Sequence, residues 1–81
     1  MPKPLVTIIM VAYNSMKIKH ILDEALDHLF KIEYRPVEIV IVDNGSSDGT
    51  FEYLREFVSN KAPRDIQVKL LKLSKNYGFA I

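Results

Sequence analysis

Two short apolar runs, each followed by a segment with helical periodicity, constrain the fold of this chain more than any other feature. Residues 5–11 (LVTIIMV) and 37–42 (VEIVIV) are rich in β-branched residues and end at turn-forming residues, so each predicts a strand. Both runs are apolar at both alternating positions, which is typical of parallel strands that are covered on two faces. The pattern therefore favours a parallel α/β sheet.

A helix is predicted after each of these strands. Apolar residues recur at spacings of three and four over residues 16–31, and again over residues 51–58, with charged residues between them. Asn14 or Ser15 is expected to cap the first helix, and Asp48 the second.

A third strand is predicted over residues 66–73 (IQVKLLKL), where apolar and polar residues alternate. Gln67 and Lys69 fall on the polar side, and a lysine there suits the edge of a sheet.

The resulting β-α-β-α-β order predicts a Rossmann-like parallel sheet with strand order 3-2-1. Right-handed crossovers would place both helices on one face, leaving an apolar second face without cover. The uncovered face predicts that this chain is only the first portion of a three-layer α/β domain. A third helix could begin near the last residues, 76–81, which supports the same expectation. The uncovered face makes self-association a further expectation.

Composition excludes several classes of protein. Eleven Lys and Arg against ten Asp and Glu give a net charge of +1, which argues against a dedicated nucleic-acid binder. Zero cysteines exclude disulfides and thiolate metal sites. No apolar run reaches the ~18 residues of a membrane span, and no signal-peptide core follows the start, so we expect a cytoplasmic protein, with peripheral membrane association open for a full-length form.

Chemistry is expected where the strands end, because ligands of open α/β sheets bind beyond the carboxyl ends of the strands. Three segments meet there, and together they offer an aromatic face, a carboxylate, several amides and a lysine, which suits a nucleoside. The candidate residues are Ala12, Tyr13, Asn14, Asp43, Asn44, Gly45 and Ser46, with Lys75, Asn76 and Gly78 as weaker candidates.

Three motifs carry a family resemblance. TIIMVAYN, EIVIVDNGSSDGT and LKLSKNYGFA, in this order, resemble the opening of the family 2 glycosyltransferases, which have the A-type nucleotide-diphospho-sugar transferase fold. The resemblance implies that residues 1–81 form the N-terminal nucleotide-binding portion of such a domain. It further implies that the loop with Ala12, Tyr13 and Asn14 flanks the nucleoside, and that the acidic pair after the second strand binds base or ribose.

Two departures from the family pattern matter. Most members carry two aspartates after the second strand, whereas here Asn44 follows Asp43. The Asn44 amide keeps an oxygen that can accept the N3–H of uracil or thymine. We therefore expect a UDP- or dTDP-type sugar donor, and the molecule that receives the sugar is unknown. The family's metal motif and catalytic base lie downstream of these residues. The resemblance therefore implies Mg²⁺ or Mn²⁺ in the full-length enzyme, with no catalytic residue or metal ligand in this chain and no activity of the chain alone.

Other readings stay open on the residues themselves. Ser47 and Asp48 fit a turn and a helix cap better than a ligand site, and Lys75 fits a solvated lysine. His20, Glu24 and His28 share a helical face that could hold a metal, although a solvated face is the simpler interpretation. The whole chain could also be another nucleotide-binding domain, such as a receiver-like module, or a non-catalytic interaction module.

Overall fold

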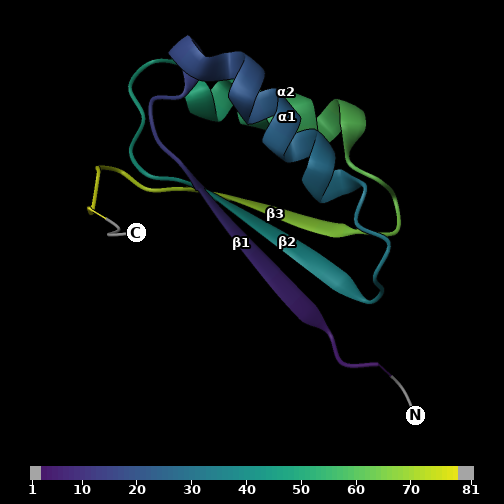
Figure 1. The fold of residues 1–81 in the computed structure, drawn as a ribbon. Coiled ribbons are helices and arrows are strands. Elements are labelled where there is room, and N and C mark those ends of the chain that lie inside the picture. Colours follow the sequence, from purple (N-terminus) through teal and green to yellow (C-terminus); the bar gives the residue numbers. More distant parts are fainter. Residues whose placement is uncertain (1–2, 79–81) are drawn as a thin grey trace.

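The computed structural model describes residues 3–78, which form a three-stranded sheet with two α-helices (Figure 1). The first predicted helix begins with a single 3-10 turn, Met16–Ile18, before the α-helix proper. The elements in chain order are β1 (Val6–Ala12), α1 (Lys19–Phe30), β2 (Val37–Asp43), α2 (Thr50–Lys61) and β3 (Gln67–Lys72). The predicted order of strands and helices is therefore confirmed.

The sheet is parallel throughout, with β2 between β1 and β3. In the register, Ala12 lies beside Asp43, and Asp43 lies beside Lys72, so all three strands end at one level. Strand order and direction match the prediction of an incomplete Rossmann-like arrangement.

Both helices cover the same face of the sheet (Figure 1), as right-handed crossovers require. Alternate residues of β2 point into this layer, and Ile39 and Ile41 are fully buried there. The ring centroids of Phe30 in α1 and Phe57 in α2 lie 5.9 Å apart. The rest of the core comes from Ala12, Leu22, Leu26, Val37, Leu54 and Ile66. Burial of these apolar side chains holds the two layers together.

A hydrogen bond also joins the two helices. The Tyr53 hydroxyl of α2 donates to the Asp23 carboxylate of α1. Burial, with this carboxylate next in importance, raises the pKa of Tyr53 to about 12. The phenol therefore stays protonated at neutral pH and keeps its role as a donor.

The opposite face of the sheet carries apolar side chains that no described element covers. Strand register places Ile9, Val11, Val40, Val42 and Leu71 there, because they alternate with the residues that face the helices; we call this set the uncovered face. Ile9 is 66% exposed. Toward the strand starts the same face is polar, where Glu38 accepts a hydrogen bond from Thr7 at 2.7 Å and pairs with Lys69 at 3.8 Å.

Within residues 3–78, neither helix has the length and apolar character needed to cross a bilayer.

Candidate functional site

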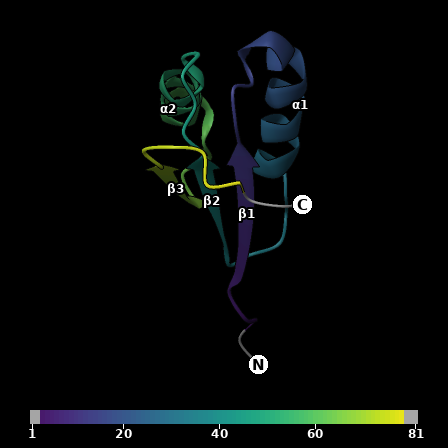
Figure 2. The same ribbon diagram turned by 90° about the vertical axis from the view of Figure 1, so that its left-hand side faces the viewer.

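The three predicted loop segments come together at the carboxyl ends of the strands. Figure 2 views the sheet from this end and shows the segment after β3, drawn in yellow, running across the end of β2 towards β1. Backbone bonds join the strand ends: the Asn44 N–H donates to the Ala12 carbonyl at 2.8 Å, and the Leu73 N–H donates to the Asp43 carbonyl at 2.9 Å. Parallel pairing thus places the candidate residues of all three loops at one edge of the sheet, namely the edge formed by the carboxyl ends of its strands.

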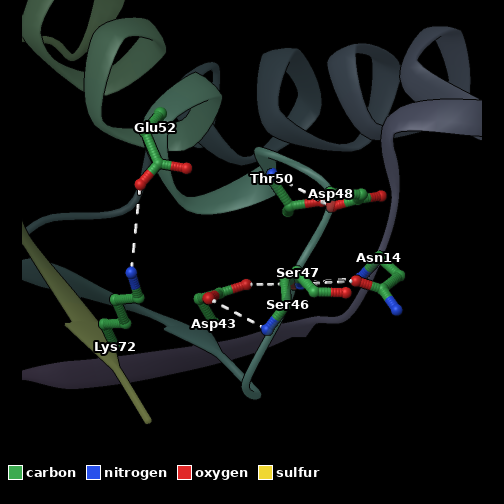
Figure 3. A network of polar contacts seen from close by, with 8 residues as sticks. All are labelled: Asn14, Asp43, Ser46, Ser47, Asp48, Thr50, Glu52 and Lys72. Atoms are coloured by element: carbon green, nitrogen blue, oxygen red, sulfur yellow. Dashed lines mark hydrogen bonds and ion pairs between the residues drawn. The ribbon is translucent and has the colours of Figure 1, made fainter. Parts of the chain in front are cut away.

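The loop after β1 is fastened to the loop after β2 (Figure 3). The Asn14 N–H donates to the Ser46 hydroxyl, and the Ser47 N–H donates to the Asn14 side-chain oxygen, each at 2.9 Å. Asn14 has a φ of 44°, in the left-handed region that asparagine tolerates better than most residues. Its backbone and side chain therefore both serve the contact between the loops.

Three more hydrogen bonds extend this contact toward the start of α2. The buried Thr50 hydroxyl accepts from the Ser15 N–H at 2.8 Å and donates to Asp48, whose other oxygen accepts from the Met16 N–H at 3.1 Å. The hydrogen bond from the Thr50 hydroxyl is the main reason that the pKa of Asp48 falls below its ordinary value. Asp48 thus links the first turns of both helices.

The predicted helix caps need correction. Neither Asn14 nor Ser15 makes a side-chain cap bond at the start of the first helix, because Asn14 bonds the second loop and the Ser15 hydroxyl donates to the Tyr13 carbonyl. The N-cap position of α2 is Gly49, with Asp48 one residue before it. Asp48 nevertheless accepts from the Thr50 N–H at 3.1 Å, so it satisfies a first-turn donor as a cap would.

Asp43, the carboxylate predicted to contact base or ribose, is fully buried at the end of β2. It accepts from the Ser46 N–H at 3.3 Å and from the Ser46 hydroxyl. Tyr13 at the neighbouring strand end is 46% exposed, whereas Ala12 is buried. The edge thus combines a buried polar floor with an exposed aromatic ring.

Asn44 holds the segment that follows β3. Its side-chain nitrogen donates to the Asn76 side-chain oxygen at 2.9 Å, and its own oxygen accepts from the Tyr77 N–H at 3.0 Å. Gly45 lies flat against this segment, since a Cβ built on it would stand 2.2 Å from the Lys75 carbonyl carbon. The weaker candidates Lys75, Asn76 and Gly78 are therefore positioned by the second loop.

Lys75 also has an aromatic partner. Its ammonium group stands 5.3 Å from the centroid of the Tyr77 ring, within the range of a cation–π contact. Both side chains are exposed, so the pair is accessible to a ligand at this edge.

Sequence reasoning missed Thr50. This residue bonds both Ser15 and Asp48 from a fully buried position. Its place directly after Asp48 and Gly49, at the predicted start of a helix, was the signal that pointed to a polar role.

The alternative metal face on α1 receives no support within residues 3–78, where no group of three or more acidic or histidine side chains could hold an ion. A shallow hollow of about 390 Å³ runs along α1, lined by Ile21, Glu24, Ala25 and His28. None of the predicted nucleotide-site residues lines it.

Comparisons with known proteins add to this geometry. Residues 7–81 match the family described as glycosyl transferase family 2. A Haemophilus influenzae protein named "uncharacterized glycosyltransferase" is 30% identical over 76 residues, which cover 94% of this chain and 21% of that relative. The chain thus spans about a fifth of the length of the curated relative that it matches.

Proposed function

This chain belongs to glycosyl transferase family 2, and on that premise we propose that it binds the nucleotide part of a nucleotide-diphosphate-sugar donor. In the proposal the bound donor passes its sugar to an acceptor hydroxyl, so the chain forms the donor-binding part of a glycosyltransferase with the A-type fold. The observation that carries it is the meeting of three loops at the carboxyl ends of parallel strands, where open α/β sheets bind ligands.

Each loop supplies a different kind of contact in this proposal. The exposed Tyr13 ring and the Ala12 and Asn14 backbone form a wall for the nucleoside. The loop from Asp43 to Ser46 forms the polar floor. A pyrimidine is the proposed base, since oxygen atoms of the loops that meet here can accept its N3–H, so UDP and dTDP are the proposed donor nucleotides.

The Lys75 ammonium supplies the positive charge for the diphosphate. It has no acidic partner among the described ion pairs, and its contact with Tyr77 leaves the charge in place. A diphosphate held near it gains from charge-assisted hydrogen bonds, which are stronger than neutral ones.

The proposal gives the described residues a role in binding and none in sugar transfer itself. The divalent ion that the family resemblance implies would prefer several carboxylate oxygens. The described part of the chain holds no such group, so the residues present do not fit that ion and no step runs through it. We expect the chain alone to hydrolyse or transfer no sugar.

A titration of the isotope-labelled chain with UDP, followed by NMR, tests the proposal. We expect shifts at the backbone signals of Tyr13, Ser46 and Lys75, and none at His28 in the outer hollow of α1. Replacing Asp43 by Ala should abolish the shifts, while the matched His20→Ala variant on α1 should keep them. Circular dichroism checks that both variants fold. Absence of UDP-dependent shifts in the unmodified chain, or shifts confined to α1, would refute the proposal.

A further inference from the structure

We propose that Asn44 is a positioning residue for the nucleotide site. Together with Asn76 and Gly45 it holds residues 74–78 across the strand ends, and it acts on the nucleotide through that segment. We call these contacts of Asn44, Asn76 and Gly45 the latch. The effect of the latch on nucleotide binding rests on the proposed function. The contacts that form the latch lie within this chain and do not depend on that function.

The side-chain amides of Asn44 and Asn76 form the latch. Asn44 is 5% exposed, donates to the Asn76 side-chain oxygen at 2.9 Å and accepts from the Tyr77 N–H at 3.0 Å. The same Asn76 oxygen also accepts from the Gly78 N–H at 2.7 Å. Two amides thus hold two consecutive backbone N–H groups of the crossing segment.

These bonds fix which way both amides point. Backbone N–H groups only donate, so the atom of Asn44 that faces Tyr77 and the atom of Asn76 that faces Gly78 must both be oxygens. The Asn44 nitrogen then faces the Asn76 oxygen as donor to acceptor. A carboxylate at position 44 would keep the bond from Tyr77, but it would set an oxygen against the Asn76 oxygen. An amide at position 44 is therefore specific to this arrangement.

Gly45 makes a second, independent part of the latch. Its φ of +75° and its missing Cβ let the backbone of Lys75 and Asn76 lie directly against it. A Cβ there would stand 2.4 Å from the Asn76 nitrogen, a distance that requires the crossing segment to move.

The latch matters because the held segment carries the Lys75–Tyr77 pair. Holding Lys75, Asn76 and Gly78 in place before the ligand arrives reduces the ordering cost of binding. Nucleotide affinity should then depend on Asn44 even though its amide is occupied within the chain. This role differs from direct recognition of the base by residue 44, which a carboxylate could perform as well.

Two variants with the same charge change separate these roles. Asn44→Asp replaces the donor that faces Asn76, whereas Asn76→Asp keeps an oxygen that accepts from both Asn44 and Gly78. Each variant adds one negative charge at the same edge, so the general electrostatic repulsion of a nucleotide is similar in both. Amide exchange and NMR relaxation at Tyr77 and Gly78 report on the latch without ligand, and a UDP titration reports on the site.

We expect Asn44→Asp to speed exchange at Tyr77 and Gly78 by about fivefold or more and to weaken UDP binding by a similar factor, because a net hydrogen bond is lost. Asn76→Asp should leave exchange unchanged and weaken UDP binding less. Asn44→Ala, which removes both bonds, should exceed Asn44→Asp in both measurements.

Other results overturn the proposal. Unchanged exchange in Asn44→Asp and Asn44→Ala would show that no latch exists. Faster exchange with unchanged UDP affinity would remove the role in positioning, and tighter UDP binding by Asn44→Asp would assign position 44 to direct base recognition. If the unmodified chain binds no UDP, the proposed function and the positioning role fail together, while exchange still decides the latch.

Discussion

Asp43 ends β2, Asn14 lies in the loop after the neighbouring strand β1, and a single hydroxyl group connects the two residues. The Asn14 N–H donates to the Ser46 hydroxyl at 2.9 Å, and that hydroxyl donates to the buried Asp43 carboxylate. One side chain of the second loop therefore satisfies a backbone donor of the first loop and a buried acceptor at the strand end. The geometry of the proposed floor depends on this hydroxyl.

Replacing Ser46 by Ala should lower the free energy of unfolding by about 1–3 kcal/mol, because it leaves the buried Asp43 oxygen and the Asn14 N–H without this partner. Ser47→Ala is the matched control, since Ser47 contributes its backbone N–H to the Asn14 contact. It should change stability by less than about 0.5 kcal/mol. Urea denaturation measures both variants, and equal losses would contradict the role of the Ser46 hydroxyl.

Gly45→Ala should destabilise the chain more than Gly49→Ala. Both glycines have positive φ, 75° and 91°, so an alanine at either position meets backbone strain. Only the Cβ at position 45 would also collide with the segment after β3, since nothing lies within 4 Å of a Cβ at position 49. The difference between the two thermal midpoints isolates the collision. If Gly49→Ala lowers the thermal midpoint by as much as Gly45→Ala, the close approach at Gly45 contributes nothing to stability.

Stability should fall in acid partly through Asp48. Hydrogen bonds lower the folded-state pKa of this carboxyl below its ordinary value of 3.8, so the charged form favours folding. That contribution is present above pH 3.8 and is lost as the pH falls through the lower folded-state value. Asp48→Asn should reduce the dependence of stability on pH in this range, as followed by denaturation at a series of pH values.

Asp65 provides a comparison for that experiment. Its pKa is lowered mainly by its hydrogen bond with Arg35, whose side-chain nitrogen lies 2.9 Å from the carboxylate. Asp65→Asn should reduce the acid dependence in the same sense, but it should leave the contact between the first two loops intact. A profile of Asp48→Asn that follows the unmodified chain at every pH would rule out the contribution of Asp48.

The uncovered face should cause the isolated chain to associate with a second copy. A set of exposed and half-buried apolar side chains on one sheet face favours burial against a partner surface, and a second copy offers an identical one. Replacing Ile9 and Leu71 together by Thr should weaken the association. Ile21→Thr, on the exposed side of α1, is the control. Sedimentation over a range of concentrations measures it, and a monomer at every concentration would contradict the expectation.

Sequence periodicity was sufficient for the architecture. The apolar runs at residues 5–11 and 37–42 predicted parallel strands, and the order of elements then predicted the strand order and the shared face of both helices, all of which the structure confirms. Gln67 and Lys69 are exposed on the edge strand as expected. These features follow from local burial patterns and chain connectivity, which a sequence displays directly.

Partners of the polar loop residues could not be predicted in the same way. Asn14 and Ser15 are residue types that are common at helix N-caps, but their hydrogen-bonding partners Ser47 and Thr50 lie more than 30 positions away. Local propensity favours a cap for any such residue, and only the three-dimensional pairing of strands brings the competing partners within reach. The Asn44 contacts with Asn76 and Tyr77 were missed for the same reason.

Three hydrogen bonds between the first two loop regions have backbone donors on one side and side-chain acceptors on the other, and this difference affects tolerance to substitution. Asn14, Ser15 and Met16 all offer backbone N–H groups, while the acceptors are the side chains of Ser46, Thr50 and Asp48. Packing, and not loss of the donor, should therefore limit a saturation library at positions 15 and 16, because Ser15 is buried and Met16 packs against the core. The three acceptor positions should accept few residues, because each of these bonds depends on a side-chain oxygen.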